Sequence, residues 1–89
     1  NRDMKQYEKI LKALANKRRL EILKYLKNKK RASVGEIARS IKLSFKSTSR
    51  HLSVLSAIDI FEKEYDRLNI FYSMSPRLPT LVQRVISLL

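Results

Sequence analysis

Residues 33–57 read SVGEIARSIKLSFKSTSRHLSVLSA, and this stretch decides the fold. It opens as a capping box, with Ser33 as the N-cap of a helix and Glu36 three positions later. We expect a tight turn of roughly three residues after this helix, and a second helix at about 45–57 that Ser44 caps. Two short helices joined in this way form a helix-turn-helix unit, which the sequence predicts at about 33–57.

The second helix of this unit has an apolar face and a cationic face. At helical spacing, the side chains expected to point inward are Ile37, Ala38 and Ile41 in the first helix, and Phe45, Thr48, Leu52 and Leu55 in the second. The opposite face carries no acid, so it can enter the major groove of DNA, where arginine pairs with guanine and serine reaches phosphates or base edges. The alternative is an ordinary solvated helix face. The candidate DNA contacts on this helix are Ser44, Lys46, Ser47, Ser49, Arg50, His51 and Ser53.

His51 borders the apolar stripe and is the one histidine of the chain. A contact to the DNA backbone and simple packing both remain open for it. A metal site is not expected here, because no cysteine, second histidine or neighbouring carboxylate completes a ligand set.

Two further helices are expected before the unit. The apolar stripe Met4, Tyr7, Leu11 and Leu14 predicts a helix at about 4–15. Asn16 can cap the next helix, whose buried side is expected to carry Leu20, Ile22, Leu23 and Leu26. A cationic loop follows at 27–31 and supplies the candidate phosphate contacts Lys29, Lys30 and Arg31.

The period changes after the unit from helical to extended. Residues 60–74 predict a β-hairpin, the wing, in which Arg67 near the tip is a candidate minor-groove contact. Ser75 and Pro76 then predict the start of a last helix at about 76–88. Its apolar face is expected to hold Leu78, Leu81, Val82, Val85, Leu88 and Leu89. The expected fold is mainly α with a small β-hairpin: one winged helix-turn-helix domain over 1–89, with five helices in the order α-α-α-α-β-β-α.

Charge points to a polyanionic partner. The chain has 89 residues and a net charge of +12, and residues 1–58 hold 16 basic and 4 acidic side chains. Such a field attracts DNA, RNA or anionic lipid, although a basic surface can also serve solubility alone. Without cysteine, with one histidine and without a glycine-rich phosphate loop, we expect neither an enzyme nor a cofactor. No apolar run is long enough to span a membrane, and we expect a cytoplasmic, nucleoid-associated protein.

Three segments resemble the ArsR family of winged-helix repressors. Residues 14–23, LANKRRLEIL, resemble that family's opening motif, and Leu43-Ser44 together with Ser49-Arg50-His51-Leu52 and Leu55 resemble its recognition helix. Phe71-Tyr72-Ser73 stands where the family has an aromatic pair after the wing, so the resemblance spans about 10–75. It implies a repressor that binds an inverted repeat in double-stranded DNA as a homodimer. The first and last helices of each chain would form the dimer interface.

The residues agree with a dimer, because so small a chain is not expected to bury two apolar helix faces well by itself. The expected interface residues are Met4, Tyr7, Leu11, Leu14, Leu78, Leu81, Val82 and Val85. The alternative is that both stripes pack onto the core of a single chain.

The chain departs from the family pattern at several positions. Ser33-Val34-Gly35 replaces the Cys-Val-Cys of the family's metal sensors, and 76–89 contains no His, Asp or Glu, so neither metal site is expected. Asp59 replaces a usual glycine, and the acidic wing makes strong contact with phosphates doubtful. Two other functions remain open: an RNA-binding or ribosome-associated winged-helix protein, and a winged-helix protein-interaction module.

Overall fold

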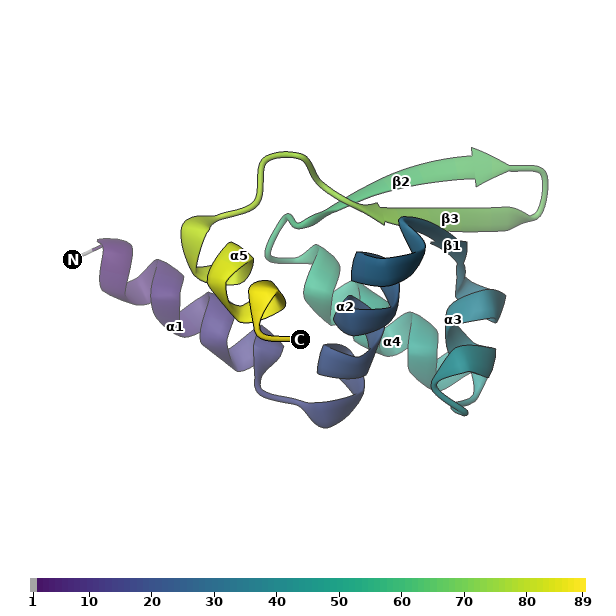
Figure 1. Ribbon diagram of the computed structural model, residues 1–89, viewed down its shortest axis with the longest axis horizontal. Coiled ribbons are helices and arrows are strands. Elements are labelled where there is room, and N and C mark those ends of the chain that lie inside the picture. The colour runs from purple at the N-terminus through teal and green to yellow at the C-terminus, as the bar shows by residue number, and fades with distance from the viewer. Residues whose placement is uncertain (1) are drawn as a thin grey trace.

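Five helices and three strands make up residues 2–89, the part of the chain that the computed structural model describes (Figure 1). In order they are α1 (Arg2–Leu14), α2 (Lys17–Lys29), β1 (Arg31–Ser33), α3 (Val34–Ser40), α4 (Phe45–Ser56), β2 (Phe61–Asp66), β3 (Asn69–Met74) and α5 (Thr80–Ser87). Helices α3 and α4 are the predicted helix-turn-helix unit, and β2 with β3 is the predicted wing. The winged helix-turn-helix fold is therefore confirmed. None of the helices in 2–89 is both long and apolar enough to cross a bilayer.

Side-chain caps set the starts of three helices, as the sequence predicts. Asn16 and Ser44 each accept a hydrogen bond at 3.1 Å from the backbone N–H three residues further on. Ser33 and Glu36 form the full capping box: the Ser33 hydroxyl accepts from the Glu36 N–H at 3.2 Å, and the Glu36 carboxylate accepts from the Ser33 N–H at 3.0 Å. That backbone hydrogen bond is the main reason why the pKa of Glu36 is lowered. The helix starts are thus set by local chemistry.

Two backbone hydrogen bonds close the turn between α3 and α4. The Leu43 N–H donates to the Ala38 carbonyl at 3.0 Å, and the Lys42 N–H donates to the Arg39 carbonyl at 3.3 Å. This pair of bonds is a Schellman motif, and Lys42 takes the left-handed conformation that the motif requires, with φ 56°. The turn fixes the direction in which α4 leaves α3.

The core lies among the five helices, and α2 and α3 are the helices that pack against β1 and β3. Its fully buried large side chains are Ile10, Ile22, Leu23, Leu26, Ile37, Leu52, Leu55, Ile60, Val82 and Thr48. Ile10 is a correction to the stripe expected in α1: it is 1% exposed, whereas Met4, Tyr7 and Leu11 are 67%, 48% and 49% exposed. The inward face of α1 is therefore rotated away from most of the predicted stripe.

The sheet has three strands and not two. Strand β1 pairs antiparallel with β3, which makes the strand order β1-β3-β2. Ala32 is fully buried opposite Tyr72, and the Tyr72 ring meets Phe61 edge-on at 5.4 Å. The expected element order was wrong in this respect, because a strand of three residues is too short to show a period of two.

The last helix begins later than predicted. Helix α5 starts at Thr80, after the N-cap Pro79, and has no side-chain cap. Ser75 was expected as the cap, but its hydroxyl instead accepts from the Arg77 N–H in an irregular segment. Pro79 explains the delay, because a proline disfavours helical conformation in the residue before it and ends any helix attempted from Pro76.

Phe45 is a second correction to the predicted apolar faces. Thr48, Leu52 and Leu55 are buried as expected, but Phe45 is 61% exposed at the first position of α4. Tyr65 on the wing is also exposed. The expectation that Phe45 points inward is therefore wrong.

Thr48 allows a test of core packing. It is fully buried, and its hydroxyl has no hydrogen-bond partner among the described residues. An unpaired buried hydroxyl costs about 1–3 kcal/mol. We expect Thr48→Val to raise the free energy of unfolding by about 1 kcal/mol in urea titrations, and Thr48→Ser, which keeps the hydroxyl and loses the methyl, to lower it. A lower urea midpoint for the valine variant would contradict this assignment.

Candidate nucleic-acid interface

Helix α4 presents a cationic outer surface. Lys46, Arg50 and Ser53 are exposed, and no acidic residue lies in this helix. Ser47 and Ser49 are half-buried beside them, and the exposed Ser44 caps the helix. The predicted contacts of this helix, except His51, therefore lie on or beside one accessible polar face. The major groove of DNA is wide enough to admit an α-helix, so this face of α4 can enter it.

A groove of about 360 Å³ runs between α4 and the wing. Phe45, Ser49 and Ser53 line it from α4, with Val34 and Gly35 from α3. The wing contributes Lys63, Leu68, Asn69, Ile70 and Tyr72. Sequence reasoning missed Lys63, which lies among acids in β2, and its ammonium sits 5.5 Å from the Tyr72 ring centroid. The alternation of side chains along β2 could have shown that Lys63 points to the other face from Glu62 and Glu64.

The His51 side chain is held by α2. Arg19 Nη1 lies 3.2 Å from His51 Nδ1, and since arginine can only donate, Nδ1 accepts and the ring proton lies on Nε2. Arg19 also donates to the Ala13 carbonyl at 2.5 Å, so one guanidinium joins the end of α1 to α4. Burial lowers the pKa of His51, and the charges of Arg19, Arg18 and Arg50 lower it further.

This pKa shift predicts a pH-dependent stability. The folded chain holds the His51 pKa below its ordinary value of 6.5, so in mild acid the unfolded chain binds more protons. The contribution of His51 is complete above that ordinary pKa and is lost as the pH falls through the folded value. We expect the free energy of unfolding to decrease from pH 7 toward pH 5, and to decrease less in His51→Gln. An unchanged pH profile in the variant would show that another group is responsible.

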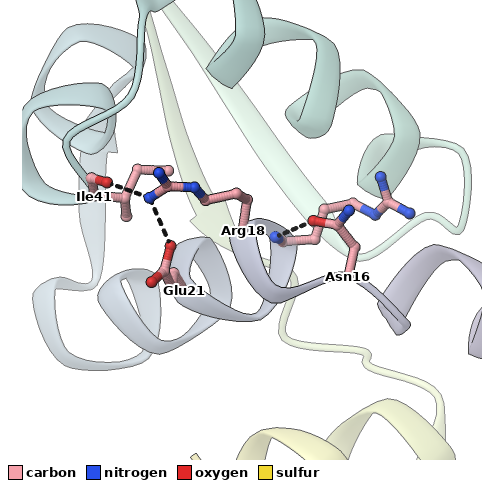
Figure 2. Close-up of polar contacts among 5 residues, drawn as sticks. Asn16, Arg18, Glu21 and Ile41 are labelled. Carbon is pink, nitrogen blue, oxygen red and sulfur yellow. Dashed lines mark hydrogen bonds and ion pairs between the residues drawn. The ribbon is translucent and has the colours of Figure 1, made fainter.

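Arg18 ties the helix-turn-helix unit to α2 (Figure 2). Its Nη1 donates to the Ile41 carbonyl at the end of α3, at 2.6 Å, and to Glu21 Oε1 at 3.1 Å. Figure 2 shows Asn16 capping the same end of α2. Sequence reasoning gave no role to Arg18 or Arg19, because the partners that join them to other parts of the fold, Ile41 and His51, lie 23 and 32 residues away along the chain.

Removing the Arg18 contact should loosen this attachment. We expect Arg18→Ala to lower the free energy of unfolding by about 1–2 kcal/mol, because the Ile41 carbonyl at the end of α3 loses a charge-assisted hydrogen bond from the guanidinium. Thermal and urea unfolding measure the change, with the exposed Arg77→Ala as the matched control. Equal stability of the two variants would show that the Arg18 contact does not stabilise the fold.

The predicted cationic loop is shorter than expected. Lys29 ends α2, Lys30 follows with φ 72°, and Arg31 already lies in β1. The Arg31 Nε donates to Glu64 Oε1 at 2.8 Å, and its guanidinium lies 3.9 Å from the centroid of the Phe71 ring. All three cations are exposed, but none of them lines the groove beside α4.

The wing tip carries the remaining predicted contact. Arg67 is exposed in the turn between β2 and β3 with φ 58°, and Leu68 beside it is fully exposed. In Figure 1 this tip and the α3–α4 turn lie at the same end of the molecule, away from α1 and α5. The arrangement brings the wing tip to the side of the chain where α4 begins.

Comparison with known proteins identifies the family. The model of the bacterial regulatory protein arsR family matches residues 16–60, which include α2, β1, α3 and α4. The chain belongs to the ArsR family. Comparison with curated protein sequences gives no match.

Several solved structures share the fold over nearly the whole chain. Reduced HlyU from Vibrio cholerae N16961 is 32% identical with a TM-score of 0.83, covering 98% of this chain and 87% of that one. The homodimeric winged helix-turn-helix domain Mb0332 from Mycobacterium bovis is 27% identical with a TM-score of 0.78, covering 96% and 75%. The transcriptional repressor PagR of Bacillus anthracis is 26% identical with a TM-score of 0.78, covering 97% and 94%. This ArsR-family chain is thus similar to DNA-binding transcriptional regulators.

An apolar surface of this ArsR-family chain lies along α1 and α5. Met4, Tyr7 and Leu11 are exposed, and a groove of about 440 Å³ beside Tyr7 and Leu11 separates α1 from Leu81. Leu78, Leu81 and Val85 are partly buried against the core. Leu14 and Val82 were also expected at a dimer interface, but they are 4% and 0% exposed within one chain, so they belong to its core.

One departure from the ArsR pattern has a structural reason. Asp59, where the family has a glycine, takes φ 60° after α4. Aspartate is among the few residues besides glycine that tolerate this left-handed conformation. Within 2–89, no three His, Cys, Asp or Glu side chains gather as a metal site would require.

Proposed function

We propose that this ArsR-family chain represses transcription by binding an inverted-repeat operator in double-stranded DNA as a homodimer. The observation that carries the proposal is the exposed Lys46–Arg50–Ser53 face of α4, which no acid neutralises. It stands beside a groove that the wing closes on one side. A duplex would place its major groove on this face and one sugar-phosphate strand toward the wing.

Affinity and specificity come from different residues. Lys29, Lys30 and the N-terminal amides of α4 attract phosphates, which releases counterions and favours every sequence alike. Arg50 and Lys46 read base edges, with Ser47, Ser49 and Ser53 contacting either bases or phosphates. Arg67 at the wing tip reaches the adjacent minor groove. Arg31 contributes less than its neighbours, because Glu64 already pairs with it.

Two copies of the chain double the readout. The exposed side chains Met4, Tyr7 and Leu11 form an apolar face on α1 that a second copy would cover. The related domain Mb0332 is homodimeric, which supports this arrangement. Two α4 helices related by a two-fold axis read half-sites about 34–36 Å apart, one turn of DNA.

Selection from a random pool of duplexes tests the proposal. The purified chain should enrich an inverted repeat with half-sites about one helical turn apart. Absence of enrichment, or displacement of the DNA by structured RNA at equal salt, would contradict it in favour of another partner. Transcription in vitro from a promoter that overlaps the selected operator should decrease when the chain is added, and an increase would contradict repression.

A further inference from the structure

Phe45 is out of place for an ordinary surface residue. It occupies the first position of α4 with 61% of its surface exposed, among cations and serines. It belongs neither to the buried core nor to the apolar side chains packed against the core. Within 2–89 it makes no ring-ring or cation-π contact. Packing inside the chain therefore does not explain why this position is aromatic.

The position of Phe45 directs it toward bound DNA. The Cα–Cβ bonds of a helix tilt toward its N-terminus, so a side chain in the first turn points past the helix end. In a helix-turn-helix unit, the N-terminal residues of the recognition helix are those that meet base edges. Phe45 lines the groove with Ser49, and Lys46 follows it on the exposed face.

We propose that Phe45 reads the 5-methyl group of a thymine in the major groove of each operator half-site. Thymine is the one DNA base with an apolar group in that groove, and phenylalanine is among the side chains that contact it. The neighbouring polar residues of α4 recognise hydrogen-bonding groups and phosphates, so they cannot supply this discrimination. The inference rests on the proposed function, since it requires α4 to lie in the major groove.

Replacing thymine with deoxyuridine removes only this methyl group and leaves base pairing intact. A series of operators is synthesised from the sequence that the chain selects. In each operator, deoxyuridine replaces thymine at one position, and the same position is replaced in both half-sites. At one position, wild-type affinity should fall roughly fourfold for each half-site, the effect of exposing one buried carbon. Phe45→Ala should bind the thymine and deoxyuridine operators equally, and Phe45→Leu should retain most of the discrimination.

Leu68 provides the control, because it is an apolar residue on the other side of the same groove and is even more exposed than Phe45, at 100% against 61%. Leu68→Ala should keep the full preference for thymine. The inference is overturned if no deoxyuridine substitution weakens binding of the wild type, or if Phe45→Ala keeps the preference for thymine. In either case the proposed function still stands if binding to the operator depends on Arg50. If the wild type selects no duplex at all, the proposed function and this inference fail together.

Discussion

Arg50→Ala should weaken binding to the selected operator by about 1–3 kcal/mol for each half-site, roughly 5- to 150-fold. Arg50 is exposed at the middle of the cationic face of α4, and no carboxylate pairs with it among the described residues. Its guanidinium can therefore form two parallel hydrogen bonds to guanine N7 and O6. Losing them should also relax sequence preference at one position, which titration against operators changed at single base pairs would measure.

Two controls separate base reading from charge. Lys29→Ala should weaken binding to all sequences alike, because Lys29 lies at the end of α2 and outside the groove. Arg77→Ala removes the same charge from the irregular segment before α5 and should change affinity least. If Arg50→Ala binds the operator as tightly as the wild type does, the assignment of α4 is wrong.

Leu11→Asp should abolish the homodimer and, with it, tight operator binding. Leu11 is 49% exposed beside Tyr7 on α1, so the substitution leaves the core of one chain intact but places a charge in the apolar face. A monomer engages one half-site at a time, and the loss of linkage between two sites reduces affinity by roughly 10²- to 10⁴-fold. Light scattering should report one chain of 10.5 kDa where the wild type shows twice that mass.

Lys5→Asp is the matched control for this variant. It places the same carboxylate on the same helix, on a side away from the Tyr7–Leu11 stripe, and should remain dimeric although it changes the net charge by two units where Leu11→Asp changes it by one. Circular dichroism should show equal helix content for both variants. A Leu11→Asp protein that keeps the dimeric mass would place the interface elsewhere.

Sequence reasoning succeeded at three of the four predicted helix caps, where the chemistry is local. Asn16, Ser33 and Ser44 bond to the backbone within their own helix start, so a few neighbouring letters suffice to predict them. Long apolar periods likewise fixed the order of the five helices and the position of the wing. The polar face of α4 followed from the same periodicity, because Lys46 and Arg50 lie opposite Leu52 and its buried neighbours.

The misses have two physical causes. Strand β1 and the start of α5 depend on short segments, where pairing with β3 or the restriction imposed by Pro79 outweighs any period. The burial of Ile10, the exposure of Phe45 and the roles of Arg18 and Arg19 depend on how elements distant in sequence pack together. A stripe of apolar letters does not tell whether the same chain or a second copy covers it.

Chemical protection of guanine N7 is the most direct test of the central claim that Arg50 on α4 reads the major groove. The selected operator is methylated with dimethyl sulfate in the presence of the wild type or of Arg50→Ala at saturating concentration. We expect the wild type to protect a guanine N7 in each half-site that the variant leaves reactive, while every other guanine that the wild type protects stays protected by the variant. Identical protection by both proteins, or protection absent from both half-sites, would contradict the account.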